Sequence, residues 1–279
     1  MNWLEDKNSV LRISLDDLRK MTRDDFRPEQ PMRLDITSPD VTVPLLVVRR
    51  EYAEQLIILN NGAVDLKRSQ GKPIFQRSSW WEDISSHQIY VCDPGTIGPD
   101  ALALNWMQGT PPLWVNSLIA KTVRIIAQHL DVRNPLDRTY FGSSAGGFAA
   151  LLQLSADKQA RCLVNNAQFD WTKWYAHHVT PVLQAHFAGR TAAEVRKSWP
   201  HRANALQYLL RKPEPLNIEY HVNAASSYDI DIQLPIFEKF FSANRSLCNS
   251  VVVHRYYDDQ QGHSPFPRLT TLDLLNTRK

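Results

Sequence analysis

Short runs of apolar, β-rich residues alternate with helical stretches along most of the chain. Eight runs have the length and composition of buried β-strands: residues 32–37, 43–49, 55–59, 88–93, 139–142, 161–166, 218–223 and 251–257. A helix over 113–130 is predicted by apolar residues at helical spacing, and shorter helices are predicted over 148–154 and 236–241. This alternation is typical of parallel strands joined by crossover helices. We therefore predict an α/β fold with an eight-stranded, mostly parallel, doubly wound sheet.

The N-terminal part of the chain departs from this alternation of strands and helices. Only a turn-like Ser38-Pro39-Asp40 separates the first two strands, which is too short for a crossover helix. These strands are therefore expected to form an antiparallel hairpin at one edge of the sheet. Residues 1–31 are mostly polar and are assigned to an N-terminal extension, within which residues 11–15 are a candidate extra edge strand.

A segment rich in Trp, Tyr and His interrupts the alternation at residues 171–215. It fits no strand, and it has helical segments near 180–188 and 192–199. We assign it to a helical lid inserted into a core made of residues 32–170 and 216–279. A structural subdomain and a lid that shapes a pocket account for the aromatic side chains equally well.

Composition excludes several classes of protein. Hydrophobic residues make up 43% and charged residues 22% of the 279 residues, a globular mix that excludes a disordered or fibrous chain. The net charge of +3 comes from scattered basic residues, so no nucleic acid partner is expected. We expect no membrane span, because no apolar run reaches about 18 residues, and the polar first residues do not resemble a signal peptide. Cys92, Cys162 and Cys248 lie in or beside apolar runs, which favours buried free thiols and a cytoplasmic location.

The most informative motif is Gly142-Ser143-Ser144-Ala145-Gly146, between a predicted strand and a predicted helix. A strand that turns sharply into a helix forces its corner residue into a strained backbone conformation, and small neighbours avoid collision there. Ser144 would then present its hydroxyl at the carboxyl edge of the sheet, beside the helix N-terminus, where developing negative charge is stabilised. The motif predicts a nucleophilic serine.

A serine nucleophile needs a base and an acid. His263 lies in the loop after the last predicted strand, preceded by Gly262. Asp229, in the loop after residues 218–223, is the leading candidate for the acid that orients this imidazole. Asp170 and Asp231 remain as alternatives, since loops after neighbouring strands reach the same edge of a sheet.

Acyl transfer also needs donors for the oxyanion. The backbone N–H of Ala145 is one candidate, and the N–H of Gly62 or Ala63, in the loop after residues 55–59, is the second. Trp106, Trp171 and Trp174 are candidate substrate contacts, with core or lid packing as the alternative. We expect no metal site and no cofactor, because no metal-ligand cluster or dinucleotide fingerprint is visible.

Taken together, the Gly142 to Gly146 motif, Asn61-Gly62 and Gly262-His263 resemble, in their order, the α/β-hydrolase-fold serine hydrolases over residues 32–278. Asp93-Pro94 and the segments 104–109 and 166–170 are similar to α/β-hydrolase proteins of bacterial surface-glycan biosynthesis and accessory-secretion pathways. This resemblance implies a small-molecule or glycan ester substrate and a carbohydrate O-acyl (acetyl) esterase or acyltransferase. With such a substrate, Trp106, Trp171 and Trp174 would be candidates for stacking on sugar rings. A serine peptidase or thioesterase on the same fold, and a non-catalytic hydrolase-like binding protein, stay as alternatives.

Overall fold

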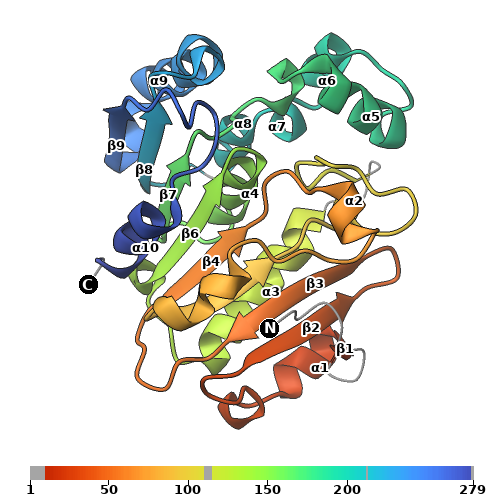
Figure 1. Cartoon of the computed structure of the whole chain (residues 1–279), viewed down its shortest axis with the longest axis vertical. Helices are drawn as coiled ribbons and strands as arrows, with labels where there is room; N and C mark the ends of the chain where they lie inside the picture. The colour runs from red at the N-terminus through yellow and green to blue at the C-terminus, as the bar shows by residue number, and fades with distance from the viewer. Residues whose placement is uncertain (1–9, 110–114, 212, 278–279) are drawn as a thin grey trace.

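A sheet of nine strands runs through the molecule (Figure 1). The computed structural model describes residues 10–109, 115–211 and 213–277. The strand order is β1-β2-β3-β5-β4-β6-β7-β8-β9, and only β3 runs antiparallel to its neighbours. The strands are β1 Val10–Ser14, β2 Pro31–Thr37, β3 Thr42–Val48, β4 Leu56–Asn60, β5 His87–Val91, β6 Arg138–Ser143, β7 Arg161–Asn165, β8 Leu216–Asn223 and β9 Cys248–Tyr256.

The sheet has one strand more than the eight predicted, and the additional strand corresponds to the candidate edge strand predicted at residues 11–15. All eight predicted strands are present, and the ninth is β1, which pairs in parallel with β2 from Val10 opposite Arg33 onward. The hairpin of β2 and β3 is antiparallel as predicted. Because β1 pairs with the outer side of β2, the edge strand of the sheet is β1 and not β2. β1 gives a weak sequence signal because it is short and lies at the edge, where Leu11 is exposed.

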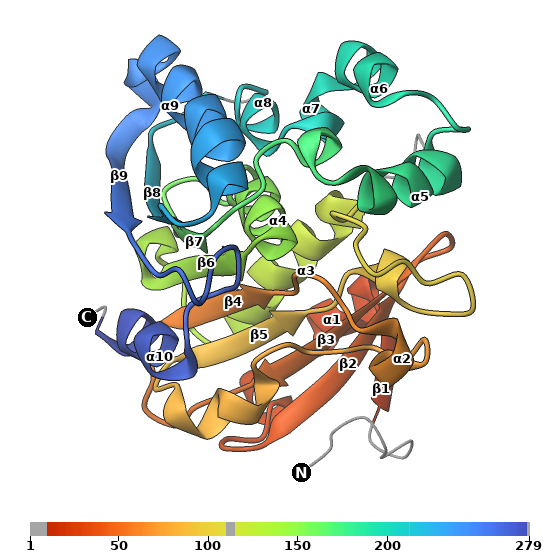
Figure 2. The ribbon, with the colours of Figure 1, turned by 45° about the horizontal axis from the view of Figure 1, so that its top comes forward.

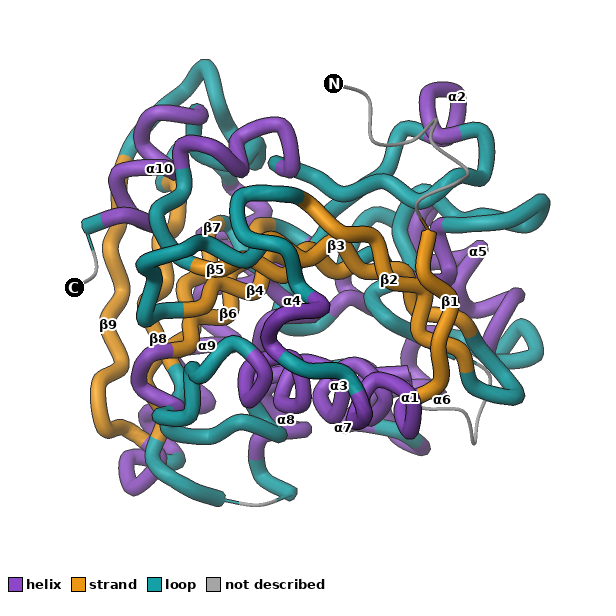
Figure 3. The backbone as a smooth tube through the Cα atoms, turned by 90° about the horizontal axis from the view of Figure 1, so that it is seen from below, coloured by secondary structure: helices purple, strands orange, loops and turns teal. Residues whose placement is uncertain are grey.

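Helices cover both faces of the sheet, as Figure 3 shows with α1 and α3 on one side of the strands and α10 on the other. The larger core packs β-strand side chains against α1, α3, α4, α8 and α9, and the smaller one packs them against α10 and a 3₁₀ helix at Ser78–Asp83. The helices are α1 Leu15–Lys20, α2 Leu66–Ser69, α3 Val115–His129, α4 Ala145–Leu154, α5 Ala176–His186, α6 Ala192–Ser198, α7 Pro200–Ala203, α8 Ala205–Leu209, α9 Leu234–Ala243 and α10 Arg268–Asn276.

The regular structure between β7 and β8 is entirely helical in the part of this segment that the structure describes. It begins with a 3₁₀ helix at Trp171–Lys173 and continues through α5, α6, α7 and α8. Figure 2 shows α5, α6 and α7 together on one side of the molecule, and α8 packs on α4. That this segment acts as a lid stays a prediction.

The cysteines differ from the expectation at one position. Cys92 and Cys162 are buried free thiols, whereas Cys248 is free but exposed. Cys248 opens the edge strand β9, most of whose residues are partly or fully exposed, so an apolar neighbour does not imply burial there. Within the described ranges, no helix combines the length and the apolar character that a bilayer crossing requires.

His87, the first residue of β5, is a buried imidazole that is expected to make the stability of the protein depend on pH. Its side chain is fully buried, and Nδ1 accepts a hydrogen bond from the Arg50 backbone N–H at 2.9 Å. Burial lowers the pKa of His87 to about 4. The unfolded imidazole has a pKa of about 6.5 and therefore takes up a proton between pH 6.5 and pH 4, where the folded one does not.

We therefore expect the free energy of unfolding to fall as the pH falls through this window, with His87 contributing about 3 kcal/mol of the loss. His87→Asn, whose amide oxygen can replace the Nδ1 acceptor, should flatten the profile. Guanidinium unfolding of both proteins at pH 7 and pH 4.5 measures the difference. Parallel pH profiles for the two proteins would contradict this assignment.

Candidate active site

Ser144 occupies a sharp corner between β6 and α4. Its backbone has φ 55° and ψ −124°, a region that residues with side chains rarely adopt. A Cβ atom at Gly142 would lie 2.0 Å from the carbonyl oxygen of Gly146, and one at Gly146 would lie 2.6 Å from that of Asn60. The glycines two positions before and after Ser144 are therefore required by close backbone approach.

Ser144, His263 and Asp229 form one hydrogen-bonded chain. His263 Nε2 lies 2.8 Å from Ser144 Oγ, and His263 Nδ1 lies 2.8 Å from Asp229 Oδ2. Asp229 is fully buried, and the His263 side chain is 27% exposed. With Nδ1 donating to the carboxylate, Nε2 carries a lone pair that can accept the hydroxyl proton of Ser144.

The two alternative acids do not contact His263. Asp170 is buried, and its carboxylate accepts hydrogen bonds from the backbone N–H and the hydroxyl of Thr172. Burial raises the pKa of Asp170. Asp231 belongs to the same π-helical turn as Asp229, at Asp229–Gln233, but it lines a surface hollow with Thr172 and Lys239. Asp170 therefore caps a 3₁₀ helix, and Asp231 is an exposed residue that forms no hydrogen bond or ion pair with His263.

Two buried asparagines hold the loop that carries His263. The side-chain amide of Asn166 lies 3.3 Å from the carbonyl oxygen of His263 and 3.1 Å from that of Ser264. Asn223 donates to the carbonyl oxygens of Asp258 and Gly262 at 2.6 and 2.8 Å. The sequence analysis missed both residues. The only signal was their place at the carboxyl ends of two predicted strands.

The predicted oxyanion donors lie beside Ser144, and one of them is already occupied. Ala145 is the first residue of α4, where a backbone N–H has no partner within the helix. The Gly62 N–H donates to Gln76 Oε1 at 2.8 Å. The neighbouring Ala63 N–H has no acceptor among the residues that the structure describes. The geometry therefore favours Ala145 and Ala63 over Gly62.

Solved structures of other proteins share this architecture. The capsule O-acetyltransferase of Neisseria meningitidis serogroup A matches with a TM-score of 0.56 and 14% identity, over 86% of this chain and 92% of that one. Acetyl xylan esterase from Paenibacillus sp. R4 matches with a TM-score of 0.55 and 12% identity, over 94% of this chain and 92% of that one. Dipeptidyl peptidase 4 from Porphyromonas gingivalis matches with a TM-score of 0.61 and 10% identity, over 89% of this chain and 35% of that one. The chain has the α/β-hydrolase fold.

This confirms the fold that the resemblance implied. No family model and no curated protein sequence matches the chain. At identities between 10% and 14%, the likeness concerns the fold, and α/β-hydrolase folds carry many activities. Function must therefore be argued from the residues around Ser144.

Gln76 holds the loop that carries Gly62 and Ala63, the predicted oxyanion donors. Its side chain accepts from the Gly62 N–H at 2.8 Å and donates to the Ala63 carbonyl oxygen at 2.6 Å. Its backbone N–H donates to Asn61 Oδ1 at 3.0 Å. Gln76 thus bonds to the peptide groups on both sides of the Ala63 N–H, although no motif in the sequence marked it.

We expect Gln76→Ala to lower kcat for ester hydrolysis by about 10-fold to 100-fold, because a loosened donor stabilises the oxyanion less. KM should change little. Arg68→Ala, on the exposed face of α2, is the matched control, and steady-state kinetics with thermal melts of both variants separate the effect from unfolding. An unchanged kcat in a folded Gln76→Ala protein would remove Gln76 from this role.

The three predicted tryptophans occupy different environments. Trp106 and Trp171 are 1% and 0% exposed, and their rings stack with centroids 5.3 Å apart. Neither presents a ring face to solvent, so the structure gives them a packing role and does not support the predicted contact with a sugar. Trp174 is partly exposed, and its ring centroid lies 4.5 Å from that of His263. Only Trp174 remains a candidate substrate contact.

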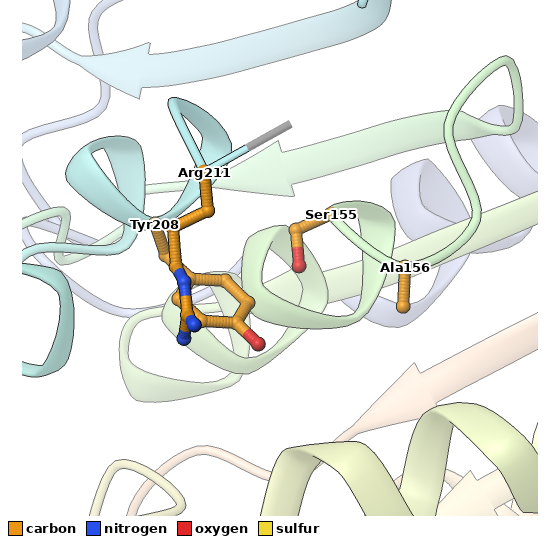
Figure 4. A pocket seen from close by; sticks show the side chains of 4 residues that line it. All are labelled: Ser155, Ala156, Tyr208 and Arg211. Atoms are coloured by element: carbon orange, nitrogen blue, oxygen red, sulfur yellow. The ribbon is translucent and has the colours of Figure 1, made fainter. Parts of the chain in front are cut away.

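Figure 4 shows a pocket lined by Ser155, Ala156, Tyr208 and Arg211. Ser155 directly follows α4, and Ser144 directly precedes it. The two ends of this ten-residue helix are about 15 Å apart. The pocket therefore lies away from the hydrogen-bonded chain of Ser144, and it contains none of the predicted site residues.

Proposed function

We propose that this protein is a serine esterase or acyltransferase that acts on O-acetyl groups of carbohydrates. The observation that carries the proposal is the hydrogen-bonded chain from Ser144 through His263 to the buried Asp229. A serine hydroxyl is a poor nucleophile without an adjacent base, and this arrangement supplies the base together with the group that orients it.

The residues present can carry out acyl transfer in two steps. Ser144 Oγ attacks the ester carbonyl while its proton moves to His263 Nε2, and the oxyanion is stabilised by the N–H groups of Ala145 and Ala63. The imidazolium then protonates the leaving alcohol, which gives an acetyl-enzyme. In the second step, His263 takes a proton from water or a sugar hydroxyl, whose oxygen attacks the acetyl carbon. The bond from that carbon to Ser144 Oγ then breaks, and the imidazolium returns the proton to Oγ.

The carbohydrate assignment has two supports. A capsule O-acetyltransferase and an acetyl xylan esterase share the fold over most of their lengths. In this chain, Trp174 places a partly exposed indole next to His263, and aromatic rings are suited to packing against the apolar faces of sugars. A glycan ester, or a glycan hydroxyl that accepts an acetyl group, is therefore the proposed substrate.

A panel of substrates tests the proposal. We expect hydrolysis of short-chain aryl esters and acetylated sugars, a preference for acetyl over longer acyl groups, and no cleavage of peptide amides. Ser144→Ala provides the blank for every substrate. Adding an unacetylated glycan and measuring its acetylation by mass spectrometry separates transfer from hydrolysis. Preferred cleavage of peptide amides would contradict the assignment and favour a peptidase.

A further inference from the structure

Three potential metal ligands gather on the neighbouring strands β8 and β9. His221 Nε2 lies 2.6 Å from Glu219 Oε1, and His254 Nε2 lies 3.6 Å from the same oxygen. The two imidazole rings are stacked, with centroids 4.5 Å apart and an interplanar angle of 16°. One ligand atom from each residue lies within 4.8 Å of the other two.

The sheet itself brings these side chains together. Glu219 and His221 are two residues apart on β8, so they point to the same face. His254 is the register partner of His221 on β9. The sequence analysis, which expected no metal site, missed the cluster because its members lie on separate strands and show no local ligand spacing.

Burial differs across the cluster in a way that suits an ion entering from solvent. The side chain of His221 is 11% exposed, that of Glu219 is 26% exposed, and that of His254 is 50% exposed. Phe266 packs edge-on against the inner imidazole, with ring centroids 5.4 Å apart. His221 is therefore fixed by packing, whereas His254 has room to turn toward an ion.

We propose that Glu219, His221 and His254 bind a divalent transition-metal ion of the Zn²⁺ or Co²⁺ class. Two imidazole nitrogens with one carboxylate oxygen form a donor set that Zn²⁺ and its neighbours prefer, whereas Mg²⁺ and Ca²⁺ prefer oxygen ligands. Zn²⁺ binds such ligands at about 2.0 to 2.2 Å, so ligand atoms on one tetrahedral ion lie about 3.4 Å apart. Binding therefore requires the 2.6 Å hydrogen bond between His221 and Glu219 to open, whereas His254 Nε2, at 3.6 Å from the Glu219 oxygen, is already near that separation.

A bound ion would tie the edge strand β9 to β8. The loop that carries His263 starts where β9 ends, and Phe266 of that loop contacts His221. The site is therefore a structural clamp beside the candidate active site, and it contains none of the residues assigned to acyl transfer. Metal binding should raise the melting temperature of the protein, since an ion bound only by the folded state stabilises it.

Titration with Co²⁺ tests the site directly. Protein without an affinity tag, treated with EDTA and dialysed, is titrated while the visible absorption of Co²⁺ is recorded, and Zn²⁺ is then added in competition. We expect one equivalent of Co²⁺ to bind and to be displaced by Zn²⁺. His254→Ala and Glu219→Gln should each weaken Co²⁺ binding by about 100-fold. Zn²⁺ should raise the Tm of the unmodified protein but not the Tm of these two variants.

Two controls make the result specific. His177→Ala removes an exposed histidine whose ring centroid lies 4.1 Å from that of the partly buried His178, and His263→Ala removes the imidazole next to Ser144. Both variants should bind Co²⁺ as the unmodified protein does. Failure to bind one equivalent, or binding that survives in folded His254→Ala and Glu219→Gln proteins, would overturn the proposal. The readout does not depend on enzymatic activity.

Discussion

Replacing His263 with alanine is expected to lower kcat for ester hydrolysis by about 10⁶-fold. His263 Nε2 lies 2.8 Å from Ser144 Oγ, and it is the only imidazole among the described residues that is bonded to this hydroxyl. Without it, the serine hydroxyl keeps its proton and the leaving alcohol receives none. Steady-state rates with an aryl acetate, compared with the uncatalysed rate, measure the loss.

His178→Ala is the matched control for this substitution. His178 is a partly buried histidine on α5, and its ring contacts that of His177. It should retain nearly all of the activity. A His263→Ala protein that keeps even a tenth of the original kcat would show that another group accepts the proton, and the proposed mechanism would then be wrong.

Asp229→Asn is expected to lower kcat by about 10⁴-fold while KM and Tm change little. The carboxylate accepts the Nδ1 proton of His263 at 2.8 Å. An amide in its place can instead donate to Nδ1, which moves the imidazole proton to Nε2, where it blocks acceptance of the serine proton. Rates measured with the same aryl acetate give the effect.

Asp170→Asn serves as the comparison, because Asp170 is also a buried aspartate, but it bonds to Thr172 and not to the histidine. It should lower the stability more than the activity. Near-normal turnover in Asp229→Asn together with a collapse in Asp170→Asn would transfer the role of the acid to Asp170.

Much of the fold, and the three residues of the hydrogen-bonded chain in the candidate site, could be predicted from local sequence signals. Buried parallel strands appear as short apolar runs, and the corner at Ser144 requires glycines at fixed positions, so both leave a mark in the sequence. The order of Ser144, Asp229 and His263 along the chain could be inferred because each follows a predicted strand, and such ends meet at one edge of the sheet.

Other features depend on contacts between distant segments. The hydrogen bonds of Gln76 and Asn166 join separate loops, which are 14 and 98 residues apart in sequence, so neither residue could be assigned a role beforehand. The tryptophans were ambiguous because an aromatic residue packs equally well in a core or beside a substrate, and only burial separates Trp106 from Trp174. Strand register, which composition does not encode, brings His254 next to His221.

One measurement tests the central claim most directly. The protein is incubated with a fluorophosphonate, which reacts with a serine hydroxyl only where a neighbouring base activates it, and the modified peptide is identified by mass spectrometry. The account predicts one adduct per chain, on Ser144, with none in Ser144→Ala and very slow labelling in His263→Ala. An unmodified Ser144 in the folded, native protein would contradict it.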